Sequence, residues 1–158
     1  MYVEEEVSRK TSTVDVQDWE QAYSEVKNIL ENRFFFHRVE EEKFRHHQEK
    51  GIIVSKLNCY REVDDYTTIE ITIVMTIEQE AQDAAQAHIT LDSKGEVVTR
   101  YPERTRFQRS VVYFALRSLW DKLVYGWARG KWKDEAQQLQ IDVHSEIRGF
   151  LQSVETRR

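Results

Sequence analysis

The segment Ile69–Ile77 constrains the fold of this chain more than any other stretch of it. Isoleucine or methionine stands at every second position, and the positions between them are mostly polar. Side chains of a β-strand point alternately to the two faces of its sheet, so the pattern predicts a strand with one buried and one largely wet face. The buried face needs a covering layer, which we expect the later helical region to supply.

Further strands are predicted around this segment, separated by short connections. They cover residues 2–11, 39–48, 52–60, 87–91 and 97–101. The last two are expected to be joined by a hairpin turn at Ser93–Gly95, because serine, lysine and glycine are common turn residues. Short connections between alternating segments favour an antiparallel meander of about five to six strands over parallel units.

One helix is predicted before most of the sheet. Apolar residues recur at spacings of three and four from Val16 to Leu30, which is the stripe of an amphipathic helix. Thr13 or Asp15 could cap its start, because a short side-chain oxygen there accepts from the first free backbone N–H groups.

The C-terminal region is also predicted to be helical. Pro102 marks its start, since proline is favoured at the first helical position. Its first part carries an apolar belt wide enough to require contact on more than one side. Gly126 and Gly130 indicate a break or kink, and a regular stripe continues from about Trp132. The pattern leaves open whether residues 104–156 form one kinked helix or two.

These elements predict a single α+β domain over residues 1–158, a length that suits one domain. An antiparallel meander is preceded by one N-terminal helix and followed by long C-terminal helices packed on the sheet. The order is helix-grip-like: a curved sheet wraps a long C-terminal helix, and a ligand can sit between the two. Element order carries little information about function.

Composition narrows the classes of protein to consider. Hydrophobic residues make up 40% of the chain and charged residues 32%, and charge interrupts every apolar stretch before the ~20 residues of a membrane span. The start lacks a signal-peptide pattern, and Cys59 has no partner for an internal disulfide, so we expect a cytoplasmic protein. A net charge of −5 argues mildly against nucleic-acid binding.

No catalytic residue, metal or cofactor is predicted. His46 and His47 are adjacent in a predicted strand and therefore point to opposite faces, and no metal-binding spacing of His or Cys occurs. Cys59 is interpreted as a small buried hydrophobe, because no nearby base would activate it. The runs Glu4–Glu6 and Glu40–Glu42 are interpreted as solvated edges, since acid–base catalysis needs a desolvated carboxylate.

An arginine cluster is the candidate anion site. It consists of Arg100, Arg104, Arg106 and Arg109. Helix N–H groups and guanidinium groups can converge on a phosphate or a carboxylate. The alternative is a solvated basic face, because basic clusters are common and no phosphate-binding glycine loop is present.

Aromatic and apolar side chains indicate two further sites. A hydrophobic ligand between sheet and helix would contact Ile71, Ile73, Met75, Phe114 and Trp120. Self-association through the C-terminal helices would use Trp127, Trp132, Leu139 and Val143. The apolar belt is too wide for the sheet alone to cover, so it fits a helical hairpin or a partner chain, and self-association is the preferred interpretation.

The sequence therefore supports a non-enzymatic binding module, for a hydrophobic small molecule or for a protein partner. An anion- or nucleic-acid-binding protein that uses the arginine cluster is one alternative. An enzyme of unknown class is another, although no nucleophile–base or carboxylate pair can be argued from spacing.

Overall fold

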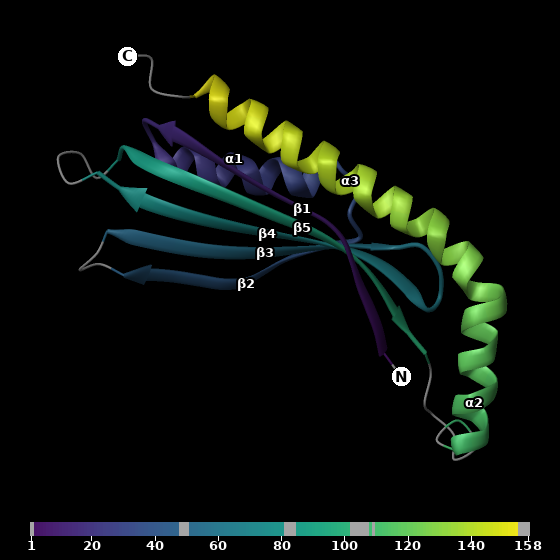
Figure 1. The fold of residues 1–158 in the computed structure, drawn as a ribbon. Coiled ribbons are helices and arrows are strands. Elements are labelled where there is room, and N and C mark those ends of the chain that lie inside the picture. Colours follow the sequence, from purple (N-terminus) through teal and green to yellow (C-terminus); the bar gives the residue numbers. More distant parts are fainter. Residues whose placement is uncertain (1, 48–50, 81–84, 102–107, 109, 155–158) are drawn as a thin grey trace.

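The computed structural model describes residues 2–47, 51–80, 85–101, 108 and 110–154. Five antiparallel strands form one sheet in the order β1-β5-β4-β3-β2, with the helices on one of its faces (Figure 1). The elements are β1 (Tyr2–Val16), α1 (Trp19–Asn32), β2 (Arg38–His47), β3 (Ile52–Glu62), β4 (Thr67–Gln79), β5 (Ala87–Arg100), α2 (Val111–Trp120), the π-helical turn η3 (Asp121–Tyr125) and α3 (Gly126–Ser153). The predicted α+β class, its N-terminal helix and its long C-terminal helix are confirmed.

β4 occupies the centre of the sheet and has the buried face that its alternating pattern predicted. All five of its alternating apolar side chains, from Ile69 to Ile77, are completely buried. α3 packs over β4 and also over β5 and β1 (Figure 1). α1 lies beside α3, toward β2. Burial of each such side chain contributes about 1.5–3 kcal/mol to folding. The expected helical cover is therefore present.

β5 is longer than predicted, and the hairpin turn expected at Ser93–Gly95 is wrong. Ser93 pairs with Ile73, and Gly95 pairs with Ile71, in an uninterrupted ladder between β4 and β5. Gly95 lies where α3 approaches the sheet: a Cβ atom there would be 3.1 Å from the Cβ of Gln140. The glycine permits close packing of backbone and helix, which is a recognised use of glycine inside strands.

The first helix begins later than its apolar stripe indicated. β1 extends to Val16, and α1 starts at Trp19. Neither Thr13 nor Asp15 caps it, because both lie inside β1. The carboxylate of Asp18 accepts a hydrogen bond from the backbone N–H of Gln21 at 3.0 Å and is the N-cap.

The C-terminal helices follow one another without interruption. The break or kink predicted at Gly126 and Gly130 does not lie at these glycines, because both are inside α3. The helix instead bends at η3, which precedes Gly126 directly (Figure 1). A π-helical turn inserts one residue into the helical ladder and is a common cause of kinks. Pro102, the predicted start, lies outside the described residues.

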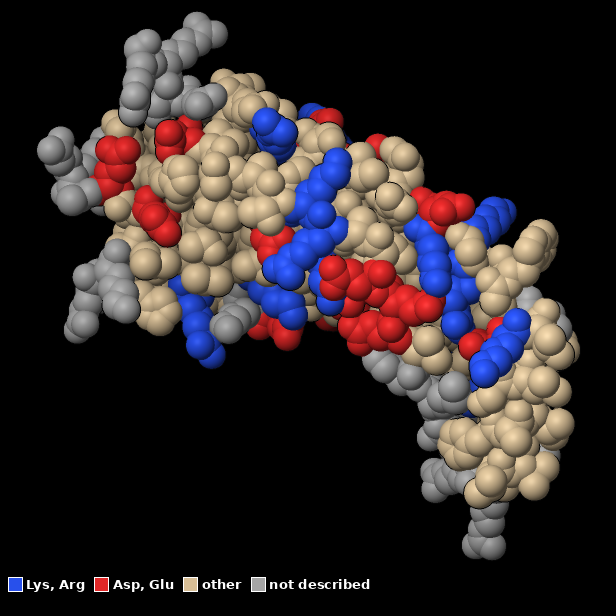
Figure 2. All heavy atoms as spheres, in the orientation of Figure 1, with Lys and Arg blue, Asp and Glu red and all other residues tan. Residues whose placement is uncertain are grey.

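Beyond this bend, α2 turns away from the line of α3 and extends past the end of the sheet (Figure 1). Arg117 is its only buried residue, whereas several of its large apolar side chains are more than half exposed. Figure 2 shows few charged side chains at this end of the molecule, while charges of both signs gather along the middle of the same face. The usual pattern of apolar-in and charged-out is therefore reversed on α2.

Candidate ligand-binding site

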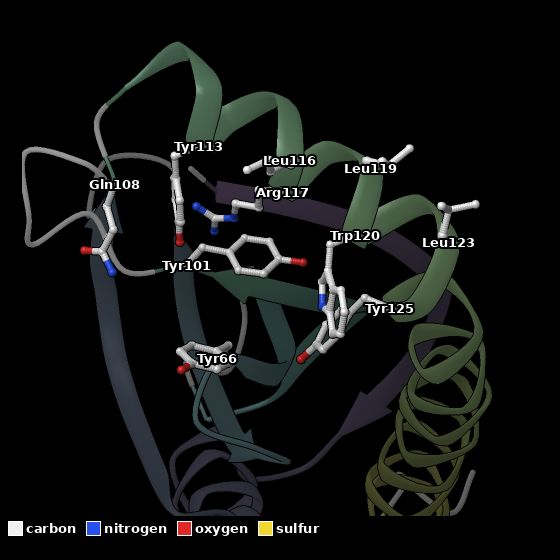
Figure 3. Close-up of a pocket in the computed structure, with 10 residues that line it drawn as sticks. All are labelled: Tyr66, Tyr101, Gln108, Tyr113, Leu116, Arg117, Leu119, Trp120, Leu123 and Tyr125. Atoms are coloured by element: carbon white, nitrogen blue, oxygen red, sulfur yellow. The ribbon is translucent and has the colours of Figure 1, made fainter.

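A cavity of about 700 Å³ lies beneath α2, at the end of the sheet (Figure 3). Its wall includes five aromatic rings, those of Tyr66, Tyr101, Tyr113, Trp120 and Tyr125. Leu116, Leu119 and Leu123 add aliphatic surface, and Gln108 and Arg117 are also part of the wall. Small-molecule sites in proteins commonly have this volume and a mostly apolar lining.

The turn between β3 and β4 positions Tyr66. The carboxylate of Asp64 accepts hydrogen bonds from the backbone N–H groups of Tyr66 and Thr67, at 2.8 and 2.7 Å. The carbonyl of Tyr66 in turn accepts from the N–H of Arg100 at 2.7 Å. Aspartate side chains stabilise turns in this way. The rings of Tyr66 and Tyr101 consequently stack at 6.4 Å.

Tyr125 ties the π-helical turn to the same end of the sheet. Its hydroxyl donates to Asp64 at 2.7 Å and lies 2.9 Å from the hydroxyl of Thr67. Burial, reinforced by the hydrogen bond to Asp64, raises the pKa of Tyr125 to about 12. Its ring packs on Trp132 at 5.3 Å, which anchors α3 beside the cavity.

Asp121, the first residue of η3, accepts all the hydrogen bonds of a partly buried polar network. It accepts hydrogen bonds from the hydroxyl of Tyr101 and from both terminal nitrogens of Arg129, at 2.5 and 3.2 Å. Burial and the nearby carboxylate raise the pKa of the Tyr101 hydroxyl. The charge of Asp121 is thus matched within the chain by Arg129.

Arg117 has no such match. Only 5% of the residue is exposed, and its guanidinium carbon lies 3.4 Å from the ring centre of Tyr101 and 5.5 Å from that of Tyr113. None of its three guanidinium nitrogens has a hydrogen-bond acceptor among the described residues. Burial lowers the pKa of Arg117 from its ordinary value. Buried charges are normally paired, so this arginine is exceptional.

The described residues include one close serine–histidine pair, which lies in the core. The hydroxyl of Ser93 lies 2.7 Å from Nδ1 of His144, but both residues are sealed in the core between β5 and α3. Burial lowers the pKa of His144, and burial likewise raises the pKa of the Cys59 thiol to about 12. Among the described residues, no three His, Cys, Asp or Glu side chains are grouped as a metal ion would require.

The predicted hydrophobic-ligand residues are divided between two places. Ile71, Ile73 and Met75 are completely buried in the core, because α1 and α3 fill the apolar face of the sheet. Trp120 lines the cavity beneath α2, and Phe114 packs edge-on against Tyr113 without lining it. The predicted set is therefore not brought together, and the cavity lies beyond the sheet.

The predicted anion residues are only partly described. Arg100 ends β5 on the polar face of the sheet, where its charge acts on Glu70. Arg104, Arg106 and Arg109 lie outside the described residues. Sequence reasoning missed Arg117, whose one available signal was that it is the sole charged residue in the ten-residue stretch of α2.

The residues predicted for self-association also separate. Leu139 and Val143 are buried in the chain's own core under the contacts of α3 with the sheet. Trp132 is partly buried against that core, whereas Trp127 is 89% exposed. Of the four, Trp127 alone presents most of its surface to solvent.

Comparison with known proteins gives no family for this chain. No protein-family model matches it, and a search of curated proteins finds no match. One solved structure, of an uncharacterised protein from Rhizobium leguminosarum, is 8% identical and has a TM-score of 0.25; the match covers 65% of this chain and 85% of the other. A likeness at that level carries no argument about function. In the described residues, no helix has the length and apolarity needed to cross a membrane.

Proposed function

We propose that this protein is a non-enzymatic binding module that holds a small hydrophobic or aromatic molecule in the cavity beneath α2. The observation that carries the proposal is the set of five rings around a space of about 700 Å³. Four of the rings are tyrosines, which combine a large apolar face with a polar tip. Such a lining suits a flat, mostly apolar ligand.

The exposed apolar side chains of α2 and η3 support this proposal. Leu116, Leu119, Trp120 and Leu123 line the cavity and are each more than half exposed. Each square ångström of apolar surface that a ligand removes from water there contributes about 25 cal/mol to binding. A contiguous exposed apolar patch on a protein surface commonly marks a binding site.

The proposal includes a cytoplasmic location. Cys59 is a buried free thiol in β3. Proteins with free cysteines and no disulfide are typical of reducing compartments. This supports the location without bearing on the ligand.

We expect Trp120→Ala to weaken binding of phenylnaphthylamine, a neutral fluorescent aromatic probe, by about tenfold or more, equivalent to about 1.4 kcal/mol. Trp120 supplies one of the five rings and is 57% exposed, so its loss should affect the ligand more than the fold. Fluorescence titration measures the affinity. Phe35→Ala is the matched control, because that ring is 85% exposed and does not line the cavity. Equal affinities for both variants would count against this cavity as the site.

A second function is favoured by a row of exposed apolar side chains on α2 and η3, three of which also line the cavity. Val112, Leu116, Leu119 and Leu123 follow one another at spacings of four, three and four, which is the seam of a coiled coil. All four are more than half exposed, and the one charge of α2, Arg117, is turned inward. We propose a second copy of this chain as the partner, because a seam of uncharged leucines is self-complementary about a twofold axis.

For this second function, Leu119→Glu is expected to abolish self-association by placing a charge in the apolar seam. Sedimentation velocity over a wide concentration range would show a dimer for the unmodified chain and a monomer for the variant. Phe35→Glu adds the same charge at an exposed ring outside the seam and should leave the dimer intact. An unmodified chain that stays monomeric at every concentration would remove this proposal.

A further inference from the structure

We infer that the ligand of the cavity is an amphipathic organic anion, with an aromatic or aliphatic body and one acidic group that pairs with Arg117. The inference rests on the proposed small-molecule function and specifies its ligand class. It is carried by the guanidinium group in the cavity wall, which lacks an acceptor among the described residues.

The first step concerns hydrogen bonding. A guanidinium group has five N–H donors and is not deprotonated in proteins. Leaving a buried charged donor without an acceptor is costly, and native chains usually avoid it. An anionic group from a ligand would supply the missing acceptor, and carboxylates and phosphates match the fork of arginine in a bidentate way.

The second step concerns the nearest acid. Asp121 lies one helical turn beyond Arg117, and its carboxylate already accepts from Tyr101 and from both terminal nitrogens of Arg129. The same end of the molecule therefore contains one arginine that is neutralised within the chain and one that is not. The described residues that line the cavity include no aspartate or glutamate.

The third step concerns orientation. The faces of Tyr101 and Tyr113 hold the Arg117 guanidinium by cation–π contacts, which fix its position without cancelling its charge. Figure 3 shows it pointing from α2 between these two rings. Its nitrogens are covered, so the inference requires the arginine or the Tyr113 ring to shift when a ligand binds. A charge beside apolar walls attracts an anion more strongly than a charge in open water.

The fourth step concerns what else the cavity can recognise. The hydroxyls of Tyr101 and Tyr125 already donate to Asp121 and Asp64. The polar tips of these two rings are thus engaged, and their faces remain for apolar contact. Recognition would therefore depend mainly on apolar contact and on the charge of Arg117, which describes an organic acid better than a sugar or a polyphosphate.

The test compares two probes with nearly the same skeleton, neutral phenylnaphthylamine and anionic anilinonaphthalene sulfonate. The unmodified chain should bind the sulfonate about tenfold more tightly than the neutral probe. Arg117→Met should remove that preference and leave the affinity for the neutral probe within about twofold. Lys122→Met removes the same charge from an exposed position outside the lining and should change neither affinity by more than about twofold.

The outcomes separate the inference from the function on which it rests. Equal affinities of the unmodified chain for the two probes would overturn the inference and leave the small-molecule function standing, a result that needs no variant. Saturable binding of neither probe would remove the function itself. If the methionine variant fails to fold by near-ultraviolet circular dichroism, Arg117→Lys retains the charge and should retain a preference for the sulfonate; loss of the preference there would also overturn the inference.

Discussion

Replacing Gly95 with valine is expected to lower the free energy of unfolding by about 2–3 kcal/mol, the cost of overpacking a filled core. A Cβ atom at this position would lie 3.1 Å from the Cβ of Gln140 and 3.1 Å from the hydroxyl of Ser8. The backbone carbonyl of Ala136 would be 3.4 Å away. Valine adds two further methyl groups in this space, so α3 must move off the sheet. Urea denaturation monitored by far-ultraviolet circular dichroism measures the loss.

Gly149→Val provides the matched control for Gly95→Val. Gly149 lies in α3, and nothing stands within 4 Å of the place where its Cβ would be. The same substitution should there change the free energy of unfolding by no more than about 0.5 kcal/mol, as at other exposed positions. A valine at position 95 that is equally well tolerated would contradict the close approach of α3 to the sheet.

Gly95 also shows why the strand boundaries could be predicted only in part. Ser93, Lys94 and Gly95 have the composition of a turn, but the ladders with β4 and β1 continue through them. The deciding facts are distant in sequence: His144 and Gln140 of α3 both contact the hydroxyl of Ser93. β4 was predictable because apolar residues alternate with mostly polar ones within its own sequence. β5 required knowledge of what packs above it.

The candidate site was less accessible to sequence reasoning than the sheet. Its rings come from the turn after β3, the end of β5 and the helices beyond, so that Tyr66, Tyr101 and Tyr125 meet only in the folded chain. Of the five residues predicted to contact a hydrophobic ligand, Trp120 alone lines the cavity. The π-helical turn orients Asp121 toward Tyr101, but the spacing of apolar residues in the sequence does not reveal it. Gly126 instead suggested a break or kink.

The two buried arginines, Arg117 and Arg129, differ in their contribution to the fold. Arg129 holds the carboxylate of Asp121 and thereby supports the bend between α2 and α3. Arg117 makes no hydrogen bond to another described residue, although it is buried to a similar degree. Groups that a fold does not need for stability, yet buries, are candidates for function. A comparison of the two therefore tests structure and function together.

Arg129→Met is expected to lower the free energy of unfolding by about 3 kcal/mol, because it leaves the largely buried carboxylate of Asp121 without its ionic partner. Arg117→Met is expected to leave the stability unchanged within about 0.5 kcal/mol or to raise it, since an apolar chain of similar length replaces a charged donor that has no acceptor. Urea denaturation of both variants at one pH measures the difference. A loss of more than about 1 kcal/mol in the free energy of unfolding for Arg117→Met would show that the contacts of Arg117 with Tyr101 and Tyr113 stabilise the fold by themselves. The guanidinium group would then have a structural role, and its lack of an acceptor would no longer indicate a ligand.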